Sequence, residues 1–189
     1  MNATTRFTKH SHTVIGCLLL LTLTACSAEG REPEHYLLPE GYQGSFYIVF
    51  NIPEGSPQTY EDGARVYDIP EDGVLLMQSD SNPGSISSDK VNFFYESGDG
   101  TREKIDGRFT TTLHDTPEAR SDNQTYIFGG GIVERQYEKR HCNIYYKEYY
   151  VGTKTQALEQ IGDFDLLSDQ GINDMPSEIF LEACNDGQP

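Results

Sequence analysis

The histidines and nucleophiles of this sequence lack the spacing that catalytic or metal sites require. Three of the five histidines, His35, His114 and His141, follow the N-terminal leader described below. None belongs to an H-E-x-x-H pair, and no C-x-x-C half-site for zinc is present. The sequence also lacks a G-x-S-x-G elbow and a phosphate-binding P-loop. We therefore expect no metal, no cofactor and no catalytic constellation, and we predict that the protein is not an enzyme.

The 30 acidic residues suggest two further kinds of chemistry. Calcium takes about six to eight oxygen ligands, and clusters of acids begin at Asp80 and at Asp163. Counted from Asp80, however, Ser85 and Val91 stand where an EF-hand needs glycine and glutamate, so turn formation explains that cluster better. A pair of carboxylates for glycoside hydrolysis stays open as an alternative function, because such a pair is assembled in space and not in sequence.

The N-terminal segment has the composition of a targeting leader. Arg6 and Lys9 precede an apolar run of thirteen residues, Thr13 to Ala25. Such a run makes about 20 Å of helix, which is too short to cross the roughly 30 Å hydrocarbon core of a bilayer. Residues 1–25 are therefore expected to be a signal peptide and not a permanent anchor.

The end of this run, Leu23-Thr24-Ala25-Cys26, resembles the lipobox of bacterial lipoproteins. The resemblance implies that Cys26 receives diacylglycerol and fatty acid such as palmitate, that the chain is cut before it, and that the lipid tethers the protein to the membrane of the cell envelope. Val14 to Cys17 is a rival match, but a cut there would leave only a very short apolar region in the leader. An ordinary secretory cut after Ala25 is the other alternative. Since Ser27 is not the aspartate that retains lipoproteins at the inner membrane, the resemblance implies the outer membrane if the host is Gram-negative.

Cys142 and Cys184 remain once Cys17 leaves with the leader and Cys26 carries lipid. A cysteine pair in an exported domain favours a disulfide, and closing a loop of about 43 residues corresponds to roughly 4 kcal/mol in the chain-entropy model. The alternative is a reactive thiol at Cys142 beside His141, although neighbours on a strand point to opposite faces. We predict the disulfide; two free thiols in protein purified without reductant would contradict it.

The charge of the chain excludes nucleic acid as a partner. The formal net charge is −16, and both cations of the leader, Arg6 and Lys9, are lost with it. The mature protein then holds 12 cations against 30 acids, a net charge of −18. Such a chain repels phosphate backbones, which proteins bind through Lys and Arg. The 12 Tyr and 9 Phe residues nevertheless supply enough large apolar groups for a folded core.

Short apolar or alternating runs between turn-forming residues are typical of an all-β domain. We predict strands over Ser45 to Ile52, Ala64 to Ile69, Gly73 to Gln78, Lys90 to Glu96, Arg108 to Leu113, Thr125 to Phe128, Ile132 to Tyr137 and Asn143 to Val151. The sixth and seventh of these flank three glycines and are expected to form a hairpin. Helices are expected only near the C-terminus, over Thr153 to Ile161, where Thr153 and Gln156 form a capping box, and over Ser177 to Cys184.

The last predicted strand has an unusual density of tyrosines. Tyr145, Lys147 and Tyr149 alternate with Ile144, Tyr146, Glu148 and Tyr150, so the two sets point to opposite faces. We expect one face to lie in the core and the other to carry ordinary cross-strand pairs. Exposed tyrosines that bind a sugar ring or a protein partner are the alternative.

These patterns together predict a mainly β fold, an antiparallel β-sandwich with one or two short C-terminal helices. Residues 26–34 are polar and contain Gly and Pro, so we expect a flexible stalk between the lipid and the fold. Residues 35–189 would then form a single β-rich domain.

Four segments resemble a family of uncharacterised bacterial lipoproteins with a domain of unknown function: His35 to Gly44, Tyr67 to Leu76, Asn92 to Tyr95 and Tyr150 to Lys154. The order of strands and Pro-x-x-Gly turns is also similar to β-sandwiches of the prealbumin or carboxypeptidase-regulatory type. Because that family has no assigned activity, the resemblance implies no catalytic residue. We therefore expect an envelope-tethered module that binds another envelope protein or a glycan, or supports the envelope structurally. A carbohydrate-processing hydrolase with paired carboxylates is the alternative.

Overall fold

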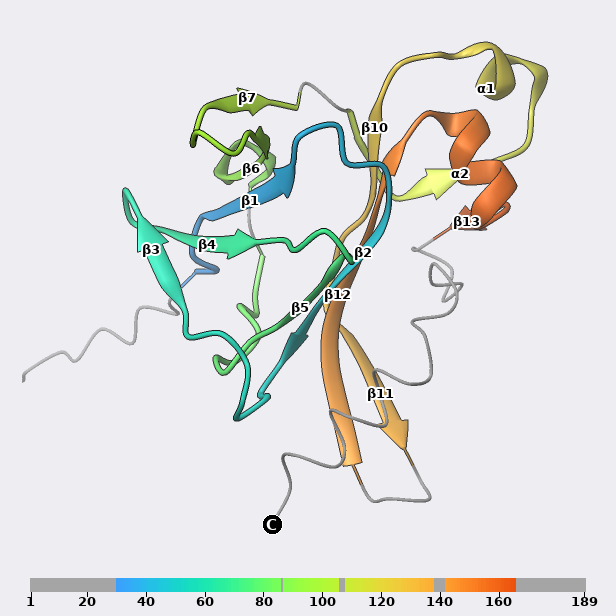
Figure 1. The fold of residues 1–189 in the computed structure, drawn as a ribbon. Helices are drawn as coiled ribbons and strands as arrows, with labels where there is room; N and C mark the ends of the chain where they lie inside the picture. The colour runs from blue at the N-terminus through green and yellow to red at the C-terminus, as the bar shows by residue number, and fades with distance from the viewer. Residues whose placement is uncertain (1–29, 86, 106–107, 138–141, 166–189) are drawn as a thin grey trace, which may run out of the picture.

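The computed structural model describes residues 30–85, 87–105, 108–137 and 142–165. Most of these residues form two β-sheets that enclose a common core, with two short helices against the second sheet (Figure 1). The mainly β fold predicted from the alternating runs is therefore confirmed.

The first sheet has five strands in the order β3-β4-β1-β6-β7. Its central strand, β1, pairs in parallel with β4 on one side and with β6 on the other. A short 3-10 turn, η1 (Ser88–Lys90), leads into β6. In chain order the strands are β1 (Glu34–Pro39), β3 (Thr59–Glu61), β4 (Ala64–Asp68), β6 (Val91–Glu96) and β7 (Arg102–Lys104).

The second sheet follows the order β5-β2-β12-β10-β8, and β11 also pairs with β12. A separate two-stranded ladder joins β9 to β13. In chain order these strands are β2 (Gly44–Phe50), β5 (Val74–Leu76), β8 (Arg108–Thr110), β9 (Thr112–Leu113), β10 (Tyr126–Gly129), β11 (Val133–Tyr137), β12 (Cys142–Gly152) and β13 (Phe164–Asp165).

Both sheets contain parallel pairs, whereas the sequence predicted antiparallel pairing throughout. The parallel neighbours are β1 with β4, β1 with β6, β2 with β5, and β8 with β10. The cause is the path of the chain, which crosses to the opposite sheet after β1, β2, β4, β5 and β7. The first three of these pairs are thus joined through the other sheet, whereas β8 and β10 are joined through β9 and a short helix. Alternating hydrophobicity reports a buried face and carries no information on the direction of the neighbouring strand.

β10 and β11 do not form the predicted hairpin. Both lie along the same edge of β12, where β10 pairs with residues 149–152 and β11 with residues 142–146. The chain continues in one direction through Gly129, Gly130 and Gly131, whose φ angles are 118, 109 and 113°. A Cβ on Gly129 would lie 2.3 Å from the carbonyl oxygen of Glu148, so only glycine permits this close approach. The hairpin partner of β11 is β12.

The main core lies between the two sheets and is rich in aromatic rings. Every side chain of β12 from Tyr146 to Val151 is buried, so both faces of this strand belong to the interior. The second face does carry cross-strand pairs, such as Tyr146 beside Val49 of β2, but these pairs are buried as well. The buried residues between the sheets are Tyr36, Leu38, Phe46, Ile48, Phe50, Tyr67, Ile69, Leu75, Met77, Phe93, Ile105, Ile127, Tyr149 and Val151.

Two short helices cover the outer face of the second sheet. α2 (Lys154–Gln160) confirms the helix predicted after residue 153, and the capping box of Thr153 and Gln156 is present. α1 (Pro117–Ser121) was not predicted; Thr116 caps it and Pro117 begins it. The other predicted helix, Ser177 to Cys184, lies outside the described residues. Among the described helices, none has the length and apolar character needed to cross a membrane.

Candidate functional site

Lys147 and Glu34 form an ion pair in the interior of the molecule. Both side chains have zero exposure. The Lys147 ammonium donates one hydrogen bond to the Glu34 carboxylate and another, of 3.2 Å, to the Tyr36 hydroxyl. Glu34 opens β1 and Lys147 lies in the middle of β12, so the pair joins the two sheets. Because each buried charge costs several kcal/mol in lost hydration, such a pair persists only with further hydrogen bonds.

Four further side chains donate to the Glu34 carboxylate, and one of them is Tyr67, whose hydroxyl lies 3.5 Å from Oε1. Tyr36 donates to Oε2 at 2.7 Å, and the Asn82 amide donates to Oε1 at 2.9 Å. The Arg31 guanidinium donates to both carboxylate oxygens, to Oε1 at 3.3 Å. The folded part of the chain therefore includes Arg31 and Glu34, which the sequence placed in the flexible stalk predicted over residues 26–34. Glu34 looked like part of a polar linker in the sequence, yet it is a buried residue of a central strand.

The network contains two cations and one anion. Burial lowers the pKa of Lys147 to about 8, and the neighbouring Glu34 carboxylate offsets only part of this effect. Burial raises the pKa of Glu34, but attraction to Lys147 and the hydrogen bond from Arg31 outweigh it, so that pKa is lowered overall. Near neutral pH all three groups are therefore mainly ionised, and Arg31, Glu34 and Lys147 together carry one positive charge.

Aromatic rings enclose this network. The Lys147 Nζ atom lies 5.1 Å from the centre of the Tyr67 ring and 5.8 Å from the centres of the Tyr36 and Phe50 rings, where cation–π attraction is favourable. The Tyr149 hydroxyl lies 3.0 Å from that of Tyr36. Burial raises the pKa of Tyr149 to about 12, so its hydroxyl stays neutral at physiological pH.

A cleft of about 850 Å³ adjoins the network and shares Arg31 and Tyr149 with it. Its lining comes from both sheets and from the loops beside them. The apolar part of the lining consists of Val91, Phe93, Ile105, Phe109 and Ile127, and the small or polar part consists of Gly84, Ser85, Ser88, Lys104, Gly130 and Gly131. Small-molecule sites in proteins commonly have volumes of about 300–1,000 Å³, with apolar walls and a few polar groups. This cleft fits that description.

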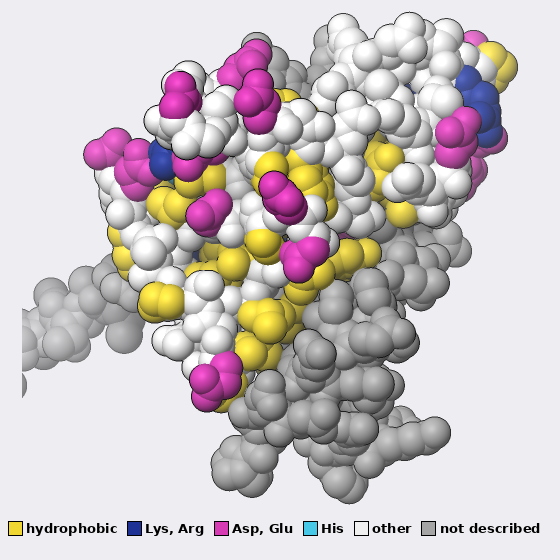
Figure 2. All heavy atoms as spheres, in the orientation of Figure 1, with side chains coloured by type: hydrophobic (Ala, Val, Ile, Leu, Met, Phe, Trp, Pro, Cys, Tyr) yellow, Lys and Arg dark blue, Asp and Glu magenta, His cyan; other side chains and the backbone are white. Residues whose placement is uncertain are grey.

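The cleft differs in charge from the chain as a whole. Its described lining includes Arg31 and Lys104 but no Asp or Glu, although acids outnumber cations 30 to 14 in the sequence. Acidic side chains are spread over the face of the molecule seen in Figure 2. The Lys104 ammonium donates to the neutral Asn92 side chain at 2.8 Å, and no ion pair between described residues involves it. Its positive charge is thus available to a ligand.

Phe109 and the glycines after β10 shape the mouth of the cleft. Phe109 is 48% exposed, which is unusual for a ring of this size, and its ring lies against the backbone of Gly130. A Cβ on Gly130 would come within 2.3 Å of that ring. Any side chain larger than that of glycine at position 130 would therefore displace the Phe109 ring.

The cysteines predicted to carry chemistry lie beyond what the structure describes. Cys26 and Cys184 fall outside the described residues. Cys142 opens β12 opposite Tyr137, and nothing is described of its side chain. Lipidation at Cys26 and the Cys142–Cys184 disulfide therefore stay predictions.

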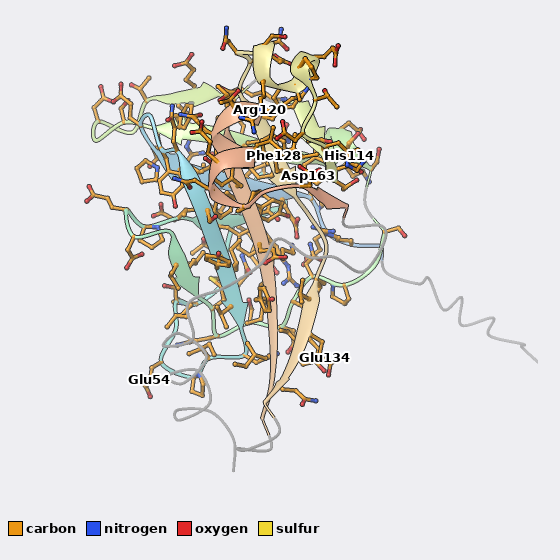
Figure 3. The ribbon with its side chains drawn as sticks, turned by 90° about the vertical axis from the view of Figure 1, so that its right-hand side faces the viewer. Glu54, His114, Arg120, Phe128, Glu134 and Asp163 are labelled. Carbon is orange, nitrogen blue, oxygen red and sulfur yellow. The ribbon has the colours of Figure 1, made fainter. Side chains whose placement is uncertain are left out.

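His35, His114 and Asp163 do not line the cleft, whereas Gly84, at the end of the cluster that begins at Asp80, does. His35 packs edge-on against Phe94 with 5.6 Å between ring centres, and Asp163 accepts a 3.0 Å hydrogen bond from the backbone of Asp115. Figure 3 shows His114 and Asp163 near the two helices, whereas Glu54 and Glu134 lie at the opposite end of the molecule. Within the described ranges, no three His, Cys, Asp or Glu side chains are grouped so that they could hold a metal ion.

Residues 30–160 match a family of unknown function, DUF6843. Among solved structures, a Bacillus anthracis protein described as a putative lipoprotein has a similar fold, with a TM-score of 0.50 and 16% sequence identity; the match covers 79% of this chain and 88% of that one. No curated protein matches the chain. The resemblance to a family with a domain of unknown function is therefore confirmed, and at this level of identity the structural likeness concerns the fold alone.

Proposed function

Because the chain belongs to the family of unknown function DUF6843, we propose a function from its own residues. The protein is a lipid-anchored module of the cell envelope that binds a ligand in the cleft between its two sheets, and it performs no reaction there. Where the host has two membranes, the anchor lies in the outer one, since Ser27 follows Cys26.

The observation that carries this proposal is the composition of the cleft. The apolar walls supply binding energy when a ligand removes them from water. The two cations, Arg31 and Lys104, in a described lining without carboxylates give the cleft a preference for negatively charged ligands. Hydrolysis of a glycosidic bond by paired carboxylates requires two acids on either side of the bond. The described lining offers neither, so binding is the better supported function.

The buried network supports binding without catalysis for a second reason. A catalytic acid or base must exchange a proton with a ligand and therefore needs a free position next to it. The Glu34 carboxylate instead accepts hydrogen bonds from Arg31, Tyr36, Asn82 and Lys147 and is fully buried. Its role is to hold the two sheets and Arg31 in place at the base of the cleft.

The anchor is supported by the leader and by the lipobox-like residues before Cys26. The similar fold from Bacillus anthracis belongs to a protein whose name also describes a lipoprotein, which agrees with this assignment.

A variant that fills the cleft tests the binding proposal. Ser88 is an exposed lining residue, so Ser88→Trp should occupy the cleft without destabilising the fold. The matched control is Ser121→Trp, at an exposed position of α1 that does not line the cleft. We expect native mass spectrometry of the mature protein, extracted gently from its membrane, to show an additional bound mass in the wild type and in the control variant. The Ser88→Trp variant should lose that mass. A wild-type protein without any bound mass, or equal retention in all three proteins, contradicts the proposal.

A further inference from the structure

We infer that the ligand of the cleft is an anionic phospholipid of the membrane to which the protein is tethered. This inference rests on the proposed function and names the ligand class of the same site. The anionic phosphate would lie at Arg31 and Lys104, and the glycerol and the first part of the acyl chains would lie between the apolar walls.

The charges of the cleft favour an anion. Arg31 uses its Nε and Nη2 atoms on Glu34, and a guanidinium has five N–H donors, so further donors remain for a ligand. Because Lys147 also neutralises Glu34, the buried network keeps one excess positive charge behind Arg31. Lys104 adds a second cation whose described hydrogen-bond partner is neutral.

The walls of the cleft favour an amphiphile over a small inorganic anion. Phe93 and Ile127 belong to the core between the sheets, and the half-exposed Phe109 extends the apolar surface to the mouth. A phosphate or sulfate ion would leave the exposed face of Phe109 in contact with water. A molecule with an anionic head and an apolar body would bury it, at roughly 25 cal/mol for each Å² removed from water.

The length of chain between the lipid and the cleft favours a membrane lipid as the source. Four residues lie between Cys26 and Arg31, so five Cα-to-Cα steps join the two. An extended chain spans at most about 3.3–3.6 Å per residue, so Arg31 lies within roughly 17 Å of the lipid-bearing cysteine. The cleft is therefore held beside the headgroup layer. The net charge of the mature protein opposes its approach to an anionic membrane, but a short tether enforces a high local concentration of lipid in spite of this repulsion.

The absence of tryptophan from the sequence allows a specific experiment. Phe109→Trp places a single fluorophore at the mouth of the cleft, and Tyr60→Trp places one at an exposed aromatic residue on β3, which does not line the cleft. The mature lipidated variants would be reconstituted into phosphatidylcholine bilayers that contain a small fraction of phosphatidylglycerol. Either lipid is supplied in turn with brominated acyl chains, which quench tryptophan on contact.

We expect the Phe109→Trp variant to be quenched by brominated phosphatidylglycerol at a membrane fraction at least about tenfold lower than the fraction of brominated phosphatidylcholine that it requires. The Tyr60→Trp variant should be quenched no better by brominated phosphatidylglycerol than by brominated phosphatidylcholine. Adding Lys104→Gln to the Phe109→Trp variant should raise the required fraction by about tenfold, because one charge-assisted hydrogen bond is lost. The same change at Lys154, on α2, serves as the control and should have no effect.

Each other outcome overturns the inference. Equal quenching by both lipids means that the cleft binds acyl chains without regard to charge. Loss of quenching upon addition of soluble glycerol phosphate or hexanoate means that the ligand is a soluble anion. An absence of quenching, combined with a bound mass that Ser88→Trp removes, excludes the phospholipid and leaves the proposed binding function standing. An absence of both excludes the two together.

Discussion

Replacing Glu34 with leucine should lower the free energy of unfolding by about 3–5 kcal/mol, because the substitution leaves Lys147 as an unpaired charge in the interior. Arg31 also loses its carboxylate partner, and the amide of Asn82 loses an acceptor. For a mature protein of this size, the melting temperature should fall by on the order of 10 °C. Urea denaturation of the mature protein, followed by circular dichroism, measures the effect.

Replacing Lys147 should lower the free energy of unfolding less than replacing Glu34 does. Lys147→Met leaves Glu34 with Arg31, Tyr36 and Asn82, so the loss should be about 1.5–3 kcal/mol, the range for a hydrogen bond to a charged group. The double variant Glu34→Leu/Lys147→Met should recover the part of the loss that comes from the unpaired Lys147, because an apolar pair of similar volume replaces two buried charges. Arg31 and Asn82 stay without this acceptor in the double variant.

A control at the surface separates this effect from the loss of an ordinary ion pair. Glu61, on the edge strand β3, pairs with Arg102, on the other edge strand β7, and both side chains are partly exposed. Glu61→Leu should change stability far less than Glu34→Leu. If the two variants are equally stable, or if Lys147→Met is the more damaging half of the pair, the structural role assigned to Glu34 is wrong.

The strands were largely predictable because short runs of β-branched and aromatic residues stand between turn formers. The ranges expected for β2, β4, β6 and β12 agree with the structure within a few residues at each end. These segments are rich in β-branched and aromatic residues, often in consecutive positions. The capping box at Thr153 likewise located α2, because its two hydrogen bonds depend only on residues three apart.

β1 was missed because its polar first residue resembles the linker that precedes it. Glu34 is acceptable in the interior only because Lys147 lies opposite, and Lys147 is 113 positions away in the sequence. The residues near Glu34 in the sequence do not indicate such a partner. The one available signal was a lysine within a run of tyrosines on β12, which indicates a buried cation when both faces of the strand are covered.

The pattern of apolar and polar residues in the sequence predicted neither the strand topology nor the cleft. The glycines after β10 suggested a reversal of the chain, but their positive φ angles serve to continue it along β12 past the carbonyl of Glu148. The cleft joins Arg31, Lys104 and Phe109, which come from distant segments. Only the packing of the two sheets brings them together.

Cys26→Ala should have the largest effect of any substitution on the location of the protein. Two or three acyl chains contribute about 0.8 kcal/mol for each buried methylene group, so the lipid accounts for nearly all membrane affinity. Without Cys26 the protein should lose palmitate labelling, and it should either appear in the soluble fraction or accumulate as the uncut precursor. Cys17→Ala is the matched control, because it removes the cysteine of the rival lipobox-like match within the leader.

Membrane fractionation of palmitate-labelled cells that express each variant is the most direct test of the envelope-tethered module. We expect the Cys17→Ala protein to be labelled, cut and membrane-bound like the wild type, whereas the Cys26→Ala protein should carry no label and be either released or uncut. A Cys26→Ala protein that is processed normally and stays in the membrane fraction would contradict the tether, and with it the proposal that the cleft is held beside a lipid surface.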